Sequence, residues 1–517
     1  MKDEKRTLKT QSDNDLLIKE WSNSIELLKS KKVAIFIVAF NSEKFIESVI
    51  ERIPNQLISL FVEIFVIDDS STDLTYEVAT RLKDKYKNCN INIYQTPFNR
   101  GYGGNQKLGY LYCIEKNYDI VVLLHGDGQY APEYLPNILT AFDNETDAVF
   151  ASRMLDKSRA LRGGMPLYKW VGNQVLTFIE NRLLGTNLSE FHTGYRAYRV
   201  ETLKKLPFVH NSDDFHFDTE IIVQLVATKA KIVEIPIPTF YGNEKSHVKG
   251  LQYAKNCIQS IIRYHLVNMG LFYSRNFDFG LFETETYQFK KSPYSLHQFV
   301  LGSELNGEMV TVELGAYKGI LSSQIAERVK EHWAIDIFTP EHAGRSRAVA
   351  LDLNTSFSDV LPQEHFDCCF ALDVIEHLDD PEKFLVDTFA ILKTNSRLYI
   401  STANIAYLLM RCLLALGQFN YGKRGILDKT HKRLFNVHTL KRLLTSYGFK
   451  IENVAGFGPP LTDLISNSKL MRFIEKIHAF FSRLYPPLFA YNFLVIATRI
   501  DSIDDIFKKT IRNEENH

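Results

Sequence analysis

The chain has 517 residues, which is too long for a single hydrophobic core and predicts about two to four domains. With 45% hydrophobic residues, 24% charged residues and a formal net charge of zero, the composition is that of a globular protein and gives no reason to expect binding to nucleic acid. The six cysteines form no CxxC pair, so we expect free thiols in a reducing compartment rather than a disulfide framework.

The ends of the chain and its most apolar segment bear on localisation. Residues 1–30 are polar where a secretory signal would be apolar, and we expect them to form a helical extension of a cytoplasmic protein, with a tail at residues 501–517. The segment IAYLLMRCLLALG is shorter than the ~20 apolar residues that cross a bilayer, and it carries Arg411. It is either a core helix or a surface that covers an amphiphilic acceptor or touches the inner face of a membrane.

Strands and helices alternate through the first half of the chain. Apolar runs predict strands at residues 33–40, 62–69, 91–96 and 119–124, with helical patterns between them. This alternation is typical of a mostly parallel sheet with helices on both faces, and such sheets bind ligands at the carboxyl ends of their strands. Asn41, Asp68, Asp69 and Asp127 each follow an apolar strand. They therefore predict one shared binding edge.

Acidic residues at two strand ends suggest a site for a metal-bound diphosphate. VIDDSSTD places Asp68 and Asp69 at one strand end, and HGDGQY places Asp127 at another. A nucleotide diphosphate gains negative charge when its bond to a sugar breaks. A cation such as Mg²⁺ or Mn²⁺ neutralises that charge, held by one or two carboxylates together with phosphate and water. The alternative for Asp127 is a plain Asp-Gly turn.

Six segments, in this order and spacing, resemble the family-2 glycosyltransferases of the GT-A fold, particularly the polyprenyl-phosphate sugar synthases: VAFNSEKFIESVI, FVIDDSSTDLT, NRGYGGNQKLGY, LLHGDGQYAPE, FHTGYRAY and FDTEIIVQL. The resemblance covers about residues 31–245. It implies an inverting, metal-dependent domain that uses a nucleotide-sugar donor and a glycan or polyprenyl-phosphate-linked acceptor. A dinucleotide-binding fold is the weaker alternative, because the glycine-rich turn follows the third strand rather than the first.

The resemblance also implies roles for individual residues of this first domain. It assigns the nucleotide to Ala39, Phe40, Asn41, Asp68 and Asp69, and the metal to Asp127, Gln129 and His125. His125 stands where the family has an acid, so it is either a ligand or donor at the metal, Mn²⁺ being preferred by imidazole, or a cap of the strand.

Acceptor-side roles follow from the same resemblance. Arg196 in FHTGYRAY would neutralise a phosphate, with a surface salt bridge as the alternative. Asp218 is the predicted catalytic base, which is needed unless the acceptor is already an anionic phosphate. Lys245, Ser246 and His247 resemble a loop that closes over the pyrophosphate.

A second alternation of strands and helices begins at MVTVELGAYKG, residues 309–319, and runs to a late strand in LFAYNFLVIATR. We place the domain boundary near residue 295, with a helix-containing linker at residues 246–300 and a second α/β domain at residues 301–500. Glu313, Gly315 and Gly319 lie in its first strand-to-helix turn, and Asp336 ends the next strand. A carboxylate there can accept both hydrogen bonds of a ribose diol, in NAD or in S-adenosylmethionine.

Three segments of this half resemble class I methyltransferases: ELGAYKG, FDCCFALDVIEHLDDPEKFL and HKRLFNVHTLKRLLTSYGFKIENV. The resemblance covers about residues 305–500 and implies a Rossmann-like domain that binds S-adenosyl-L-methionine. It assigns the cofactor to Glu313, Gly315, Gly319, Asp336, Asp352, Leu353 and Asp373. Tyr317 replaces a glycine of the motif, and a positive φ at this residue would be costly, so either the turn is reshaped or the cofactor is weakly held.

The sequence therefore predicts a bifunctional enzyme of two α/β domains. Either His377 or His431 could take the acceptor proton in methyl transfer, or both could be packing residues. The enzyme would add and methylate sugars in surface polysaccharide or glycolipid synthesis. One alternative is an active glycosyltransferase with a non-catalytic methyltransferase-like scaffold, and another is a glycan-binding protein in which neither pocket turns over.

Overall fold

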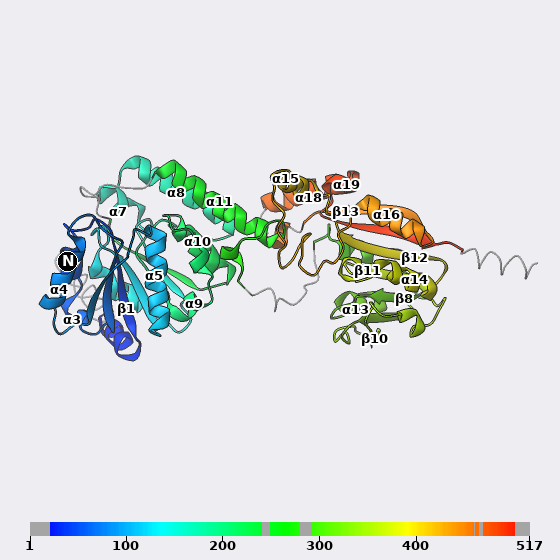
Figure 1. Ribbon diagram of the computed structural model, residues 1–517, viewed down its shortest axis with the longest axis horizontal. Coiled ribbons are helices and arrows are strands. Elements are labelled where there is room, and N and C mark those ends of the chain that lie inside the picture. The colour runs from blue at the N-terminus through cyan, green and yellow to red at the C-terminus, as the bar shows by residue number, and fades with distance from the viewer. Residues whose placement is uncertain (1–20, 240–248, 280–291, 460, 465–468, 502–517) are drawn as a thin grey trace, which may run out of the picture. The chain divides into compact units, whose positions relative to one another are not determined.

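The computed structural model describes residues 21–239, 249–279, 292–459, 461–464 and 469–501. The chain divides into two compact units (Figure 1). The first runs through Tyr264 and takes in a short stretch from Ser274, while the second comprises His265–Tyr273 and the remainder of the chain. The domain boundaries expected from the sequence remain predictions.

The first unit is built on a seven-stranded sheet of order β3-β2-β1-β4-β6-β5-β7. Its strands are β1 Val33–Ala39, β2 Glu63–Asp68, β3 Ile91–Gln95, β4 Ile120–His125, β5 Ala148–Ser152, β6 Arg196–Arg199 and β7 Ile232–Pro236. Strands β3, β2, β1 and β4 are parallel, as expected, and β5 is parallel to β7. The sheet is mixed because β6 runs antiparallel to both β4 and β5.

Helices cover both faces of this sheet. The helices of this unit are α2 Ile46–Glu51, α3 Asn55–Ile58, α4 Thr75–Lys85, α5 Tyr102–Glu115, α6 Leu135–Thr140, α7 Lys157–Arg162, α8 Leu167–Leu184, α9 Val200–Lys204, α10 Phe217–Ala227 and α11 Gly250–Asn268, whose residues from His265 onward belong to the second unit. Buried side chains of α2, α4 and α6 share one core with alternate residues of the strands. On the opposite face Phe36 stacks on Phe65 at 4.9 Å, and Tyr110 of α5 meets Phe36 edge to face at 6.2 Å.

The strand register aligns the residues that were predicted to form the binding edge. Ala39 pairs with Asp68 across β1 and β2, and Val38 pairs with His125 across β1 and β4. The ends of β2 and β4 thus flank the end of β1, about 10 Å apart at the usual strand spacing.

The second unit has a seven-stranded sheet of order β10-β9-β8-β11-β12-β14-β13. Its strands are β8 Val310–Leu314, β9 Glu331–Asp336, β10 Arg347–Ala350, β11 Phe366–Leu372, β12 Leu392–Ala403, β13 Phe449–Phe457 and β14 Asn492–Arg499. The first five in the sheet are parallel, and β14 is antiparallel to both β12 and β13. The order reverses at β8, so the gap between β8 and β11 is the switch point where doubly wound sheets bind ligands.

Helices also cover both faces of the second sheet. They are α12 Leu296–Leu301, α13 Ile320–Ala326, α14 Pro381–Ile391, α15 Leu408–Ala415, α16 Val437–Ser446, α17 Leu461–Leu464, α18 Lys469–Leu484 and α19 Pro486–Phe489, with a short 3-10 turn, η6, at Ile375–His377. Helices α14 and α16 share a core on one face, and α12 and α13 pack on the other. In the part of the chain that is described, no helix is both long and apolar enough to cross a membrane.

The close approach of α5 to β1 requires a glycine. A Cβ atom on Gly109 would lie 2.1 Å from the Phe36 ring, whereas one on Gly172 of α8 would meet nothing within 4 Å. We expect Gly109→Ala to destabilise the first unit by about 1–3 kcal/mol through overpacking. Gly172→Ala, the matched control, should stabilise it by about 0.5–1 kcal/mol. Urea unfolding of both variants checks this; equal stabilities would contradict the packing.

Candidate active sites

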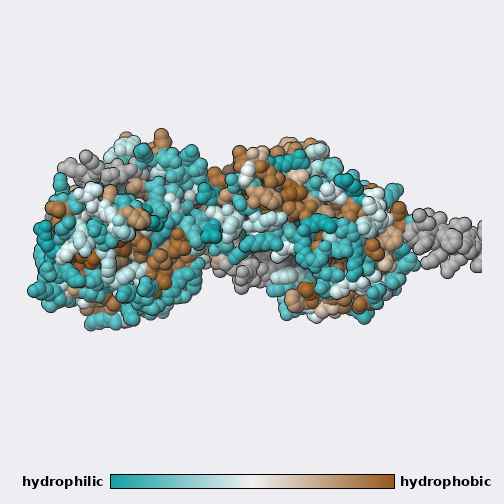
Figure 2. All heavy atoms as spheres, in the orientation of Figure 1, coloured by the Kyte–Doolittle hydropathy of each residue, from teal (hydrophilic) through white to brown (hydrophobic). Residues whose placement is uncertain are grey.

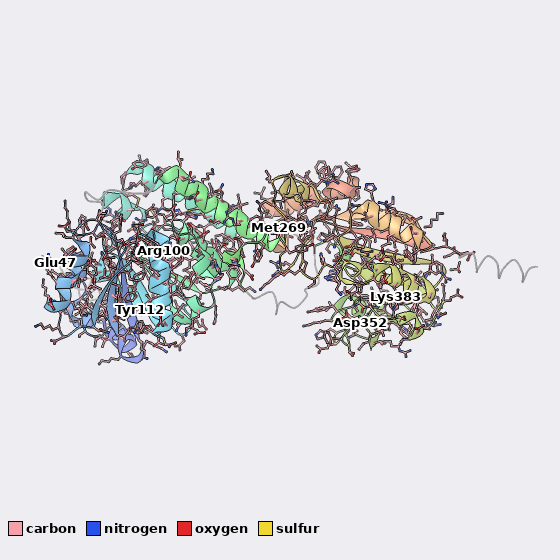
Figure 3. All side chains as sticks on the ribbon, viewed as in Figure 1. Glu47, Arg100, Tyr112, Met269, Asp352 and Lys383 are labelled. Atoms are coloured by element: carbon pink, nitrogen blue, oxygen red, sulfur yellow. The ribbon has the colours of Figure 1, made fainter. Side chains whose placement is uncertain are left out.

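The first acids at the edge of the first sheet are Asp68 and Asp69, and both are buried. Asp68 accepts hydrogen bonds from the Ser71 hydroxyl and backbone N–H and, at 2.9 Å, from Gln95 Nε2. Asp69 Oδ1 accepts from the backbone N–H of Arg100 at 2.8 Å, at the start of α5 (Figure 3). Burial raises the pKa of Asp69, and this effect outweighs the lowering of the pKa by the hydrogen bond from Arg100.

Residues after β1 lie beside these acids. Asn41 adopts a left-handed backbone with φ of 50°, and its side-chain oxygen accepts a hydrogen bond from the backbone N–H of Thr72 at 2.9 Å. Ala39 is buried, whereas Phe40 is 43% exposed. The loops after β1 and β2 are therefore tied into one surface on which Phe40 is an accessible apolar side chain.

Asp127 lies in a turn that continues β4. The backbone N–H of Gly126 still bonds to the carbonyl of Val38 at 2.9 Å, and Gly128 turns the chain with φ of 75°. Asp127 Oδ1 accepts the backbone N–H of Gln129 at 3.0 Å, and both side chains are half-buried. The Asp-Gly turn is thus formed, and it occupies one of the two carboxylate oxygens.

The His125 ring packs among aromatic side chains. Its Nε2 lies 3.2 Å from the hydroxyl of Tyr102, and the ring contacts Tyr130 edge to face at 5.0 Å. A Cβ on Gly194 would lie 2.3 Å from Nε2, so the loop backbone presses against the ring. Burial lowers the pKa of His125. These contacts engage Nε2 of the imidazole.

Asp218 and Arg196 form a buried pair. Arg196 NH1 lies 3.4 Å from Asp218 Oδ1, and the carboxylate also accepts the Tyr102 hydroxyl at 3.0 Å and Gln106 Nε2 at 3.1 Å. Arg196 donates to the carbonyls of Thr193 and Phe191, each at 2.7 Å. The guanidinium therefore fixes the loop before β6 and, being fully buried, is not at the surface.

Two further buried pairs, neither predicted, hold the same loop. Arg153 pairs with the buried Glu190 and donates to the carbonyl of His192 at 3.1 Å. His192 Nδ1 meets the Tyr253 hydroxyl at 3.0 Å, and its Nε2 lies 3.3 Å from Glu180 Oε2 on α8. Burial raises the pKa of Glu180 to about 8 and lowers that of His192 to about 4. A protonated Glu180 beside a neutral His192 therefore leaves no charge buried at this contact. Lys245, Ser246 and His247 lie outside the described residues.

In the second unit the predicted cofactor turn is formed around Asp336. Gly315 and Gly319 have φ of 82° and 81°, and Tyr317 has φ of 49°, so the turn keeps a left-handed backbone at the tyrosine too. The backbone N–H of Tyr317 donates to Asp336 Oδ2 at 2.7 Å. A Cβ on Gly315 would lie 2.1 Å from Val374, which follows β11. The turn thus lies against both neighbouring strand ends.

The remaining predicted cofactor residues differ in exposure. Glu313 is buried, accepts a hydrogen bond from the Ser322 hydroxyl and lies 3.8 Å from His332 Nε2. It therefore links the strand before the turn to the helix after it. Asp352, past β10, accepts the backbone N–H of Asn354 at 2.9 Å, and Leu353 packs into the core (Figure 3). Asp373 has φ of 54° and accepts from Ser401 Oγ at 2.6 Å and Asn492 Nδ2 at 2.7 Å.

His377 and His431 are brought together, although they lie on separate segments. Their ring centroids are 4.8 Å apart at an angle of 74°, and Glu376 lies beside them. Burial, together with the charge of Asp373, raises the pKa of Glu376 to about 8. Within the described ranges, this is the one place where three histidine, cysteine or acidic side chains converge closely enough to hold a metal ion.

Comparison with known proteins identifies both units. Residues 34–207 match the model of glycosyl transferase family 2, and residues 289–454 match that of a methyltransferase domain. The chain therefore combines a family-2 glycosyltransferase domain, related to polyprenyl-phosphate sugar transferases, with a methyltransferase domain. The predicted fold class, two α/β domains with GT-A-like and methyltransferase-like sheets, is confirmed.

Curated relatives match the first domain. The UDP-N-acetylglucosamine–dolichyl-phosphate N-acetylglucosaminyltransferase of Methanococcus voltae is 28% identical over 233 residues, which cover 43% of this chain and 91% of that protein. The undecaprenyl-phosphate mannosyltransferase of Micrococcus luteus is 28% identical over 191 residues, which cover 36% of this chain and 75% of that protein. Among solved structures, a SAM-dependent methyltransferase from Archaeoglobus fulgidus is 19% identical. The match covers 39% of this chain and 94% of that chain, with a TM-score of 0.28.

The Glu180–His192 pair predicts a pH dependence for the first unit. Because the folded state keeps the Glu180 proton up to a pKa of about 8, whereas an ordinary glutamate loses it near 4.5, stability should fall as pH rises through this window. His192, with its pKa lowered from 6.5 to about 4, acts oppositely, but only below pH 6.5. Between pH 6.5 and 8 we therefore expect a loss of about 1–2 kcal/mol.

Glu180→Gln isolates this effect, because the amide has nearly the shape of the protonated carboxyl group but does not titrate. Urea unfolding or hydrogen exchange of α8 peptides at pH 6.5 and pH 8 provides the measurement. The variant should lose the pH dependence; a dependence equal to that of the natural chain would contradict the assignment.

Proposed function

We propose that the chain is a bifunctional enzyme of glycan assembly. Its first domain transfers a sugar, with inversion, from a nucleotide sugar to a polyprenyl-phosphate-linked or glycan acceptor, and its second transfers a methyl group from S-adenosyl-L-methionine. The observation that carries the proposal is that each sheet presents, at the carboxyl ends of its parallel strands, half-buried acids with one oxygen fixed by a backbone N–H. The alternative is an active glycosyltransferase with a methyltransferase-like scaffold.

At the donor site, Asp127 would hold Mg²⁺ or Mn²⁺, with Gln129 beside it. One oxygen of Asp127 is bound to the Gln129 N–H and the other is not used by that turn. Such a cation takes most of its ligands from phosphate and water, so a single carboxylate suffices. When bound it would neutralise the charge that develops on the diphosphate. Asn41, Phe40 and the loops fixed by Asp68 and Asp69 form the nucleotide surface.

For the acceptor, the burial of Asp218 and Arg196 favours positioning over direct contact. Asp218 is 5% exposed and is shared by Arg196, Tyr102 and Gln106. We propose that the pair fixes Tyr102, and through it His125, beside the donor site. A polyprenyl phosphate is already anionic and needs no catalytic base, so this arrangement suits that acceptor.

At the methyl-donor site, Asp336 would bind the ribose of the cofactor through the oxygen that Tyr317 leaves unused. Gly315 and Gly319 would add no side chain at their two positions in the turn, Asp352 and Leu353 would flank the adenine, and Asp373 would lie near the transferred group. Alignment of acceptor and sulfonium is the main requirement of methyl transfer. The left-handed backbone at Tyr317 aims its N–H at Asp336, so the tyrosine is compatible with this site.

A lipid-linked acceptor suggests peripheral contact with an anionic membrane. Helix α18 exposes Leu470, Phe473, Ile474, Ile477, Phe480, Phe481 and Leu484. It also carries Lys469, Arg472, Lys476 and Arg483, while its one acid, Glu475, is buried. The Tyr407 hydroxyl, just before α15, lies 2.9 Å from His478 Nε2 of α18, and α15 itself exposes Leu408 and Leu414. Figure 2 shows apolar surface over α15 and α18. Basic amphipathic helices of this kind lie at the headgroup level.

Asp127→Asn tests the donor site, because asparagine keeps the hydrogen bond to Gln129 but loses the charge. We expect sugar transfer to fall by about 100-fold or more, as for removal of a group that stabilises developing charge. Methyl transfer and the melting temperature should be unchanged. Donor hydrolysis and methyl transfer are measured on the same preparation; full sugar-transfer turnover in the variant, or turnover in excess chelator, would contradict the proposal.

The α18 surface is tested by sedimentation with vesicles containing anionic phosphatidylglycerol. The double variant Phe473→Ser, Phe480→Ser should bind at least about tenfold more weakly, since two large apolar side chains are lost from the buried face. Phe338→Ser removes a still more exposed phenylalanine outside α18 and should bind as the natural chain does. Equal weakening by Phe338→Ser, or none by the double variant, would exclude α18 as the membrane surface.

A further inference from the structure

Three potential metal ligands converge past the end of β11. Glu376 and His377 belong to η6, and His431 comes from the segment before α16. One oxygen or nitrogen of each lies within 4.8 Å of those of the other two. The two segments are joined by the backbone, since the N–H of Lys432 donates to the carbonyl of Glu376 at 2.8 Å. The convergence is therefore fixed by main-chain structure and does not depend on the side chains alone.

The surroundings of His431 set which of its nitrogens is protonated. Nδ1 lies 3.0 Å from the carbonyl oxygen of Ile426, which can only accept a hydrogen bond. Nδ1 must therefore carry the proton, and the lone pair is on Nε2. A histidine that binds a metal through one nitrogen characteristically donates the other N–H to a carbonyl or carboxylate.

His377 is oriented in the same way through Thr430. Its Nδ1 lies 3.0 Å from the Thr430 hydroxyl and 3.3 Å from the Thr430 carbonyl. The threonine hydroxyl donates its own hydrogen to Asp428 Oδ1 at 2.8 Å, so it accepts from the histidine. The lone pair of His377 is then also on Nε2. The Asp428 carboxylate orients this histidine indirectly, through the Thr430 hydroxyl.

Glu376 supplies the third group. It is 2% exposed, and its Oε2 has no hydrogen-bond partner among the described residues. An unpartnered buried carboxylate oxygen is costly unless a proton or a cation lies beside it. The nearby Lys432 does not serve, because its Nζ pairs with Asp379 at 2.7 Å. Each imidazole therefore has a lone pair on Nε2, and one ligand atom from each of the three residues lies within 4.8 Å of the other two.

We propose that Glu376, His377 and His431 form a binding site for a divalent transition-metal ion of the Zn²⁺ type. Two histidines and one glutamate are a known ligand set of catalytic zinc, which keeps a further position open for water or substrate. Nitrogen ligands disfavour Mg²⁺ and Ca²⁺. Metal–nitrogen bonds of about 2.0–2.1 Å require ligand atoms about 3.3 Å apart, so atoms that are now up to 4.8 Å apart would approach by up to about 1.5 Å on binding.

The role that we propose for this ion, activation of the methyl acceptor, rests on the proposed methyltransferase function. Asp373, proposed to lie near the transferred methyl group, is three residues before Glu376 in the same segment. An acceptor hydroxyl bound at the open position would lose its proton to water more easily. Its oxygen then forms a bond to the methyl carbon as the carbon–sulfur bond breaks, and the sulfonium becomes a neutral thioether. His377 and His431 would thus hold the ion rather than act as the catalytic base.

Cobalt provides a direct readout that does not depend on activity. The full-length chain, stripped with a chelator, is titrated with Co²⁺ and separately with Zn²⁺ in the absence of nucleotide. We expect one equivalent of Co²⁺ to give the intense visible absorption of a four- or five-coordinate ion, and Zn²⁺ to displace it. No such absorption, or only the weak spectrum of hexa-aquo Co²⁺, would overturn the site.

Variants locate the ion. His431→Ala and the isosteric Glu376→Gln should each weaken Co²⁺ binding by about 100-fold or more, whereas His438→Ala, an exposed histidine on α16, should leave it unchanged. Stabilisation by S-adenosylhomocysteine shows that each variant is folded. Unchanged Co²⁺ binding in His431→Ala and Glu376→Gln would contradict the assignment. Tight binding that is lost in these variants, in a chain that transfers no methyl group, would support the site and refute the methyltransferase function.

Discussion

The hydrogen bond between an acid at a strand end and a backbone N–H of the adjoining turn organises both domains. Asp69 accepts the N–H of Arg100, Asp127 that of Gln129, and Asp336 that of Tyr317, at 2.8, 3.0 and 2.7 Å. A charge-assisted bond of this kind contributes about 1.5–3 kcal/mol and fixes the turn. It also uses only part of the carboxylate, so the remaining lone pairs keep a defined direction toward a ribose or a cation.

The two domains therefore share one arrangement of acids at their two proposed ligand sites. In the first sheet the fixed acids flank β1, where a nucleotide diphosphate and its cation would lie; in the second they flank β8, at the switch point of the sheet. The two sites differ in the side chains that lie next to these acids. Arg196, Asp218 and Tyr102 form a buried polar network beneath the first, while Glu376, His377 and His431 converge beside the second.

The sequence predicts what is local and misses what is distant. Strand-end acids such as Asp127 and the unusual Tyr317 turn were identified because their signals lie within a few residues. Strand β13 was not expected, since FKIENVAGF alternates poorly and only its pairing with β14 makes it a strand. The bond from Tyr102 to Asp218 and the contact of Glu180 with His192 arise from folding and have no sequence period. The burial of Arg196, predicted to neutralise a phosphate, and of Asp218, the predicted base, likewise could not be read from the sequence.

Hydrogen exchange of the full-length chain tests most directly whether both sets of acids bind ligands. UDP or GDP with Mn²⁺ should slow exchange in the loops after β1, β2 and β4 and leave the second domain unchanged. S-adenosylhomocysteine should slow exchange at residues 315–319 and 373–377 alone. Protection by the nucleotide only would leave the second domain as a scaffold. Protection by neither ligand would contradict the central claim that these acids form two working sites.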